Sequence, residues 1–337
     1  MTKKKLIILV FLTAAVMFLA GWFIRGFLFK NPSAEKAVLP EEKAVYELRA
    51  GGYEYINPLL ECEIMGDTEI TPLKELKAKI NTLIEGRKKQ GHIEKAAVYY
   101  RDLVNGPWMG IEEREKFNPA SLLKIPMLIA FLKLSEEYPG IMERQVTYSG
   151  EFASTTNLYD PATTLIAGEV YTIYDLIYKM IVYSDNTSKD LLKKYLNTEV
   201  SGEYLTKIAA DIDLIMPTEE DENNRVSAKS YASMFRVLFN ASFLSRGNSE
   251  KALALLAEST YKNGLKAGLP PETAIAHKFG HYGGEDISQL HDCGIIYTDK
   301  PYILCIMTLF KNEKIEQAEK LIGEISGMVY GHLNTGK

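Results

Sequence analysis

The chain has 337 residues, of which 46% are apolar and 25% charged, and its formal net charge is −5. These values exclude a disordered or collagen-like chain, and the length allows one large domain or two small ones. Three cysteines without a CxxC pair argue against a disulfide scaffold and against a cysteine-rich zinc module. Residues 1–30 carry +5 and the other 307 carry −10, and this acidic body argues against general nucleic-acid binding.

Residues 6–24 form an almost uninterrupted apolar run, which as a helix spans roughly 30 Å and can cross a bilayer. Three lysines precede the run, so the positive-inside rule predicts a cytoplasmic N-terminus and an extracytoplasmic body. A cleaved signal peptide is the alternative, but Phe18 would occupy the −3 position of a cleavage site after Ala20. We therefore expect a single-pass signal-anchor over 1–30 in the cell membrane, a tether over 31–54 and an exported domain over 55–337.

The body then alternates between helical and strand patterns. Thr71 and Pro72 favour a helix start, and apolar residues at helical spacing follow. In chain order we predict a helix over 72–90, a strand over 95–102, a mostly helical region over about 121–257 that includes helices 172–183 and 227–240, strands over 274–279, 293–298 and 302–310, and a helix over 312–331.

This order predicts an α/β fold of the α+β type. Its antiparallel sheet carries the two terminal helices on one face, and an all-helical lobe is inserted between its strands. Asp299, Lys300 and Pro301 make the last two strands a hairpin. Cys293 and Cys305 lie in apolar strand-like runs, so we expect both to be buried thiols.

Ser121 and Lys124 form an S-x-x-K pair just after Asn118 and Pro119, which are typical of a helix start. Three residues apart on a helix, the two side chains share a face. The positive end of the helix dipole stabilises an alkoxide on the serine, and a lysine in a water-poor site has a lowered pKa and can accept its proton. Taken alone, the pair is a weak signal and is more typical of an ordinary first turn.

Two further motifs follow in order. Ser184-Asp185-Asn186 lies at the C-terminal end of the apolar helix 172–183, where such residues also serve as caps. Lys278-Phe279-Gly280 ends the strand 274–279, where a lysine can project into a cleft and a glycine lets a substrate approach the backbone. The order of the three motifs resembles the penicillin-recognising serine hydrolases, and most of all the class A β-lactamases, over about residues 55–335.

The resemblance implies a role for each residue. Ser121 would be the nucleophile that forms an acyl-enzyme, Lys124 would activate it, and Ser184 would pass a proton to the leaving nitrogen and bridge the two lysines. Asn186 would bind the substrate amide and orient Lys124. The substrate carboxylate would bind at Lys278, beside Gly280, and the backbone N–H groups of Ser121 and His281 would form the oxyanion hole. The His281 imidazole is expected to line the cleft without transferring protons.

The sequence departs from the family pattern in two places. Phe279 replaces the threonine or serine of K-T-G, so a hydroxyl that could bind the substrate carboxylate is lost. No E-x-x-L-N motif, which supplies the glutamate that activates the deacylating water, stands between Ser184 and Lys278. Glu219 and Glu220 are the nearest candidates for that base, although their acidic run is more typical of a solvated loop. We also expect Pro126 to cause a kink or a tight turn in the nucleophile helix.

Three functions remain open on these grounds. The first is a membrane-anchored serine hydrolase that acts on β-lactams or D-alanyl amides, the second a D,D-peptidase-like penicillin-binding protein that acts on peptidoglycan-type peptides, and the third a catalytically slow binding or sensor domain at the cell surface. A zinc hydrolase is disfavoured because the five histidines show no HExxH pattern. No nucleotide-binding loop, metal cluster or cofactor motif is visible, so no cofactor is expected.

Overall fold

The computed structural model describes residues 47–49, 51–62, 71–152, 165–212 and 226–334. Residues Val45–Lys337 form one compact unit. Residues 1–46, which include the expected membrane segment 6–24 and most of the expected tether, lie outside the described residues. Within the described ranges, no helix is both long and apolar enough to cross a membrane.

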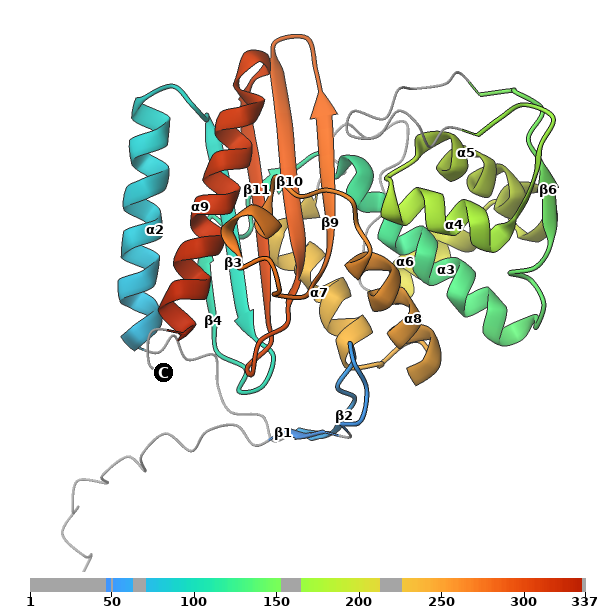
Figure 1. Ribbon diagram of the computed structural model, residues 1–337, viewed down its shortest axis with the longest axis horizontal. Helices are drawn as coiled ribbons and strands as arrows, with labels where there is room; N and C mark the ends of the chain where they lie inside the picture. Colours follow the sequence, from blue (N-terminus) through green and yellow to red (C-terminus); the bar gives the residue numbers. More distant parts are fainter. Residues whose placement is uncertain (1–46, 50, 63–70, 153–164, 213–225, 335–337) are drawn as a thin grey trace, which may run out of the picture. The chain divides into compact units, whose positions relative to one another are not determined.

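The centre of the fold is a five-stranded antiparallel sheet in the order β4-β3-β11-β10-β9. In Figure 1 these strands lie side by side from left to right. Its strands are β3 (Lys95–Asp102), β4 (Trp108–Ile111), β9 (Ile275–Gly283), β10 (Ile287–Ile296) and β11 (Tyr302–Lys311). Three two-stranded ladders lie outside this sheet: β1 (Glu47–Arg49) with β2 (Leu59–Cys62), β5 (Lys116–Phe117) with β8 (Val226–Ser227), and β6 (Gln145–Thr147) with β7 (Val170–Thr172).

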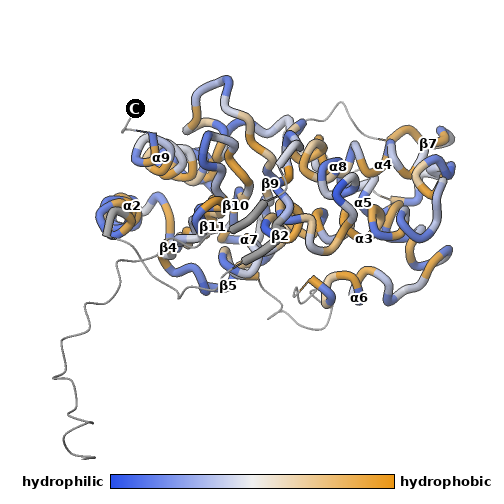
Figure 2. Tube along the Cα trace, turned by 90° about the horizontal axis from the view of Figure 1, so that it is seen from below, coloured by the Kyte–Doolittle hydropathy of each residue, from blue (hydrophilic) through white to orange (hydrophobic). Residues whose placement is uncertain are grey.

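The helices fall into two groups. The first pair is α2 (Thr71–Lys89) and α9 (Ile315–Asn334), and the second group comprises α3 (Lys124–Glu137), α4 (Ile173–Val182), α5 (Asn186–Tyr195), α6 (Tyr204–Asp211), α7 (Ala228–Phe239) and α8 (Arg246–Ala257). Short helical turns are η1 (Ala120–Leu123), η3 (Leu196–Val200), η4 (Leu265–Gly268) and η5 (Asn312–Lys314). Figures 1 and 2 show the sheet between the α2–α9 pair and the second group. The predicted fold class is therefore confirmed.

Each face of the sheet has its own hydrophobic core. Apolar residues of α2 and α9, such as Ile80 and Ile322, pack with Leu290 and Leu304 on one face. Side chains alternate along a strand, so the neighbouring residues of β10 and β11 face the helical lobe and pack with residues such as Phe235 of α7. The site described below therefore stands on a sheet that is held from both sides.

Cys293 and Cys305 form a disulfide, so the expectation of two free thiols is wrong. The predicted hairpin of the last two strands is confirmed, and its register explains the disulfide. β10 and β11 pair antiparallel with Cys293 directly opposite Cys305, and the two Cα atoms are 3.9 Å apart. Both residues are fully buried. The sequence pattern showed two apolar strands but not the alignment of one against the other.

The strands extend further than the patterns indicated. β9 continues to Gly283, four residues beyond the predicted end, so Lys278 lies in the middle of an edge strand and not at its end. β4 was not predicted, because four residues are too few to show alternation. Helix α3 begins at Lys124, which places Pro126 in its first turn, where backbone N–H groups have no partner within the helix. Pro126 therefore gives no cause for the expected kink or tight turn.

The N-terminal part of the described unit is fixed to the helical lobe. The backbone N–H groups of Glu54, Tyr55 and Ile56 donate to the carboxylate of Glu250 on α8, at 2.9–3.2 Å. The Tyr297 hydroxyl donates to the Tyr55 carbonyl at 3.0 Å. The chain therefore joins the folded body close to residue 54.

Candidate active site

Ser121 lies in the short turn η1, directly before α3. Asn118 begins this turn, because its side-chain oxygen accepts from the backbone N–H of Ala120 at 2.9 Å. Ala120 has a φ of 48°, a left-handed conformation that L-residues adopt at a cost. Ser121 thus precedes the α-helix, whereas its predicted place was in the helix's first turn. Lys124 is the first residue of α3.

Three polar side chains that sequence reasoning missed hold the nucleophile turn. The Asn118 backbone N–H donates to Gln289 Oε1, and the Asn118 carbonyl accepts from His291 Nε2, both at 2.9 Å. The Tyr231 hydroxyl donates to the Leu122 carbonyl at 3.0 Å. Gln289, His291 and Tyr231 are all buried. The sequence predicted this strand only over 293–298, so Gln289 and His291 lay outside it, and no local pattern singled them out.

The Ser184-Asp185-Asn186 motif joins two helices. Ser184 has a φ of 60° and follows α4, while Asp185 caps α5 by accepting from the Ser188 backbone N–H at 2.5 Å. Asn186 is the first residue of α5. The motif is therefore a helix cap, as residue preferences alone suggested, and it also directs Ser184 and Asn186 toward Lys124.

The Lys124 amine is the centre of the site. Its Nζ lies 2.9 Å from Ser121 Oγ, 3.0 Å from Ser184 Oγ, 2.5 Å from the Ser184 carbonyl oxygen and 2.7 Å from Asn186 Oδ1. The side chain is 1% exposed. The structure thus brings together the four residues that the S-x-x-K and SDN motifs contribute.

Lys278 reaches the same group from β9. Its Nζ donates to Ser184 Oγ at 2.8 Å and to the Phe279 carbonyl at 3.1 Å, and the side chain is fully buried. Ser184 Oγ consequently lies between the amines of Lys124 and Lys278, which is the bridge that the resemblance implies.

Burial lowers the pKa of both lysines. Desolvation is the main cause for Lys124, and the nearby charge of Lys278 lowers its pKa further, to well below 10.5. Desolvation lowers the pKa of Lys278 to about 7, although the carboxylate of Asp292 acts in the opposite direction. The site therefore carries less positive charge at neutral pH than two formal lysines indicate.

Gly280 makes room for the nucleophile turn itself. A Cβ at this position would lie 3.0 Å from the Pro119 carbonyl oxygen and 3.2 Å from the Leu122 nitrogen. We expected the glycine to admit a substrate to the backbone, but the close approach in the structure is between β9 and η1. The next residue, His281, is half-buried, and burial lowers the pKa of its imidazole, which is neutral at pH 7.

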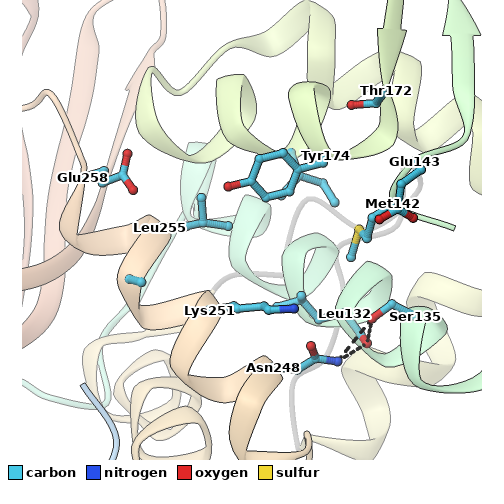
Figure 3. Close-up of a pocket in the computed structure, with 12 residues that line it drawn as sticks. Leu132, Ser135, Met142, Glu143, Thr172, Tyr174, Asn248, Lys251, Leu255 and Glu258 are labelled. Carbon is cyan, nitrogen blue, oxygen red and sulfur yellow. Dashed lines mark hydrogen bonds between the residues drawn. The ribbon is translucent and has the colours of Figure 1, made fainter. Parts of the chain in front are cut away.

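Two features lie apart from this group of side chains. Glu219 and Glu220, the candidates for a deacylation base, lie outside the described residues. A cavity of about 440 Å³ opens between α3, α4 and α8, where Tyr174 and Lys251 face each other across it (Figure 3). None of Ser121, Lys124 and Lys278 lines that cavity, so it is separate from the candidate active site.

Comparisons with known proteins show the family and the fold. The model of the beta-lactamase enzyme family matches residues 75–333. A β-lactamase from Proteus vulgaris is 23% identical over 212 residues, which cover 59% of this chain and 68% of that protein. A second β-lactamase from the same organism is 21% identical over 210 residues, which cover 59% of this chain and 75% of that protein.

Solved structures with similar folds include a mutant of PBP-A, described as an acyl-enzyme complex with penicillin G. It has a TM-score of 0.67 and 21% identity and covers 81% of this chain and 100% of that one. A class A β-lactamase from Mycobacterium abscessus has a TM-score of 0.65 and 18% identity, and the match covers 77% of this chain and 99% of that one. At these identities the likeness concerns the fold. Because the family model spans most of the chain, this protein belongs to the β-lactamase enzyme family.

Proposed function

We propose that the chain is a serine hydrolase that opens β-lactam or D-alanyl amide bonds through an acyl-enzyme on Ser121. The observation that carries the proposal is the position of the Lys124 amine, 2.9 Å from Ser121 Oγ in a buried site that lowers the lysine pKa. A neutral amine has two N–H donors and one lone pair. The Ser184 carbonyl and Asn186 Oδ1 accept the two N–H bonds, which leaves the lone pair for the Ser121 hydroxyl.

Acylation then follows from these contacts. Ser121 Oγ attacks the amide carbonyl while its proton moves to Lys124 Nζ, and the backbone N–H groups of Ser121 and His281 are proposed to bind the developing oxyanion. When the C–N bond breaks, the leaving nitrogen takes a proton from Ser184 Oγ, and Lys124 Nζ passes to Ser184 the proton that it accepted from Ser121. The Lys278 amine donates to Ser184 Oγ and holds it in place for this transfer. Asn186 orients Lys124 and is proposed to bind the substrate amide. Water then hydrolyses the ester, with Glu219 or Glu220 proposed as its base.

The experiment is covalent labelling of the full-length chain in detergent with an excess of a fluorescent penicillin. We expect one label per chain on Ser121, and none on the Ser121→Ala variant. Absence of a covalent adduct from folded wild-type protein, with the same result for a second acyl donor such as a D-alanyl thioester, would overturn the proposal.

The second candidate function is that of a D,D-peptidase-like enzyme or of a slow sensor domain. It is favoured by the missing E-x-x-L-N motif, since without a base for the deacylating water the acyl-enzyme persists. A chromogenic cephalosporin distinguishes the candidates. Turnover of several per second supports a β-lactamase, whereas a long-lived adduct with cleavage of D-alanyl peptides supports a peptidase, and an adduct without peptide cleavage supports a sensor.

We also propose that residues 6–24 anchor the protein in the cell membrane with the hydrolase domain outside. The support is the charge pattern of the sequence, with three lysines before the apolar run. Carbonate-washed membranes should retain the full chain, and protease added to spheroplasts should remove the domain. Recovery of the intact chain in the soluble fraction would contradict the anchor.

A further inference from the structure

The donors of Lys278 are already engaged within the protein. An ammonium group has three N–H donors. In the structure one reaches Ser184 Oγ at 2.8 Å and one reaches the Phe279 carbonyl at 3.1 Å. The nitrogen also lies 4.3 Å from the centroid of the Phe279 ring, within the range of a cation–π interaction. With the side chain fully buried, a substrate carboxylate would have to displace one of these contacts.

The Phe279 ring is itself held in place. It stacks on Tyr261 with the ring centroids 4.1 Å apart and the planes inclined by 24°. Both side chains are buried, and the Tyr261 hydroxyl donates to Glu319 on α9 at 3.3 Å. Swinging the ring away from Lys278 would therefore break an aromatic stack that α9 supports.

The two histidines near the site add no positive charge that would attract an anion. His281 carries a lowered pKa, and burial lowers the pKa of His291 to about 4, so both imidazoles are neutral at pH 7. The carboxylate of Glu319 accepts a hydrogen bond from the Tyr261 hydroxyl, and its charge raises the pKa of His281. A negative charge therefore lies beside the Tyr261–Phe279 ring pair.

We propose that Lys278 positions Ser184 instead of binding a substrate carboxylate. The enzyme therefore accepts acyl donors that carry no charge on the leaving group, such as substrates in which the carboxylate expected at Lys278 is replaced by an ester or an amide. The proposal rests on the acyl-enzyme function proposed above and narrows its substrate class. It departs from the role that the family resemblance implies for Lys278, and the cause is the phenylalanine in place of a hydroxyl residue. An aromatic ring covers the ammonium where a threonine would add a second donor.

The test compares benzylpenicillin with its methyl ester, which differ only in the carboxylate. Rate constants for acylation of the full-length chain are measured by intact-protein mass spectrometry. For the wild type we expect the carboxylate-to-ester ratio of these constants to lie within about threefold of one. In Phe279→Thr, which uncovers Lys278 and adds a hydroxyl, we expect the ratio to rise at least about tenfold.

Tyr282→Thr is the matched control, because this exposed aromatic residue lies on the same strand, and its ratio should equal that of the wild type. A wild-type ratio of ten or more in favour of the carboxylate overturns the inference while leaving the acyl-enzyme intact. This wild-type result decides the question even if Phe279→Thr fails to fold. Absence of any Ser121 adduct with either compound overturns the proposed function, and this inference with it.

Discussion

The Lys124 amine lies 2.9 Å from the Ser121 hydroxyl across a change of helix type, from the turn η1 to the α-helix α3. The turn is narrower than an α-helix, and side chains three residues apart eclipse each other in it. The geometry of the pair therefore depends on whatever holds η1 against the sheet. Gly280 and Tyr231 are two such supports, and each leads to a prediction.

Gly280→Ala should slow acylation of Ser121 by about tenfold or more. The added Cβ would lie 3.0 Å from the Pro119 carbonyl oxygen, so the nucleophile turn has to move away from β9. The measurement is the acylation rate constant beside the urea midpoint. Gly247→Ala is the control, since a Cβ there meets nothing within 4 Å, and this exposed helical position should gain up to about 1 kcal/mol. An unchanged acylation rate in Gly280→Ala would refute the prediction.

Tyr231→Phe should lower the free energy of unfolding by about 1–2 kcal/mol and slow acylation severalfold. The change removes the buried hydroxyl that donates to the Leu122 carbonyl at 3.0 Å. Tyr204→Phe is a matched control, because the buried Tyr204 hydroxyl has no hydrogen-bond partner among the described residues. Urea unfolding and labelling kinetics of the two variants test the difference. Equal effects of both changes would show that the Tyr231 bond does not hold the turn.

How far the sequence predicts this molecule differs between its parts. The strand over 95–102 and the helix over 172–183 follow from local apolar patterns, and the structure has both within a residue. In β3 the buried residues form a continuous run, whereas α4 buries residues at helical spacing. The meeting of Lys124, Ser184 and Lys278 follows only from the family resemblance, since residues 60 and 94 positions apart meet through the tertiary fold.

Other features could not be read locally at all. The Cys293–Cys305 disulfide depends on strand register, and the capping of Lys278 by the Phe279 ring depends on the stack with Tyr261, 18 residues earlier in the chain. Gln289 and His291 lie in the part of β10 that the sequence did not predict as a strand. Their role is to bind the backbone of Asn118, and only the tertiary fold, which brings the nucleophile turn beside β10, reveals it.

The stability of the protein should rise with pH between about 7 and 10 through Lys278. Burial lowers the pKa of this lysine to about 7 in the folded chain from its ordinary 10.5. In that window the unfolded chain binds more protons, so the free energy of unfolding increases with pH, by at most about 1.4 kcal/mol per unit for one group. Lys278→Met removes this slope. In urea unfolding at pH 7 to 9.5, parallel curves for the two proteins would contradict the lowered pKa.

Protein that is purified and denatured without reductant should expose about one thiol per chain. The sequence contains three cysteines, and Cys293 and Cys305 are joined. Titration with a chromogenic disulfide reagent measures the number, and prior reduction should raise it to about three. Three thiols before reduction would contradict the disulfide. Replacing both cysteines by alanine should lower the free energy of unfolding by up to about 3 kcal/mol.

The pH dependence of Ser121 acylation tests the central claim, that a neutral Lys124 activates the serine. Measured with an uncharged acyl donor, the rate constant should rise with pH through one ionisation well below 10.5 and then level off, because desolvation lowers the Lys124 pKa. Lys124→Met should lose at least about a hundredfold in rate at the plateau. A wild-type profile without that ionisation, together with a Lys124→Met variant that acylates within threefold of the wild type, would contradict the account.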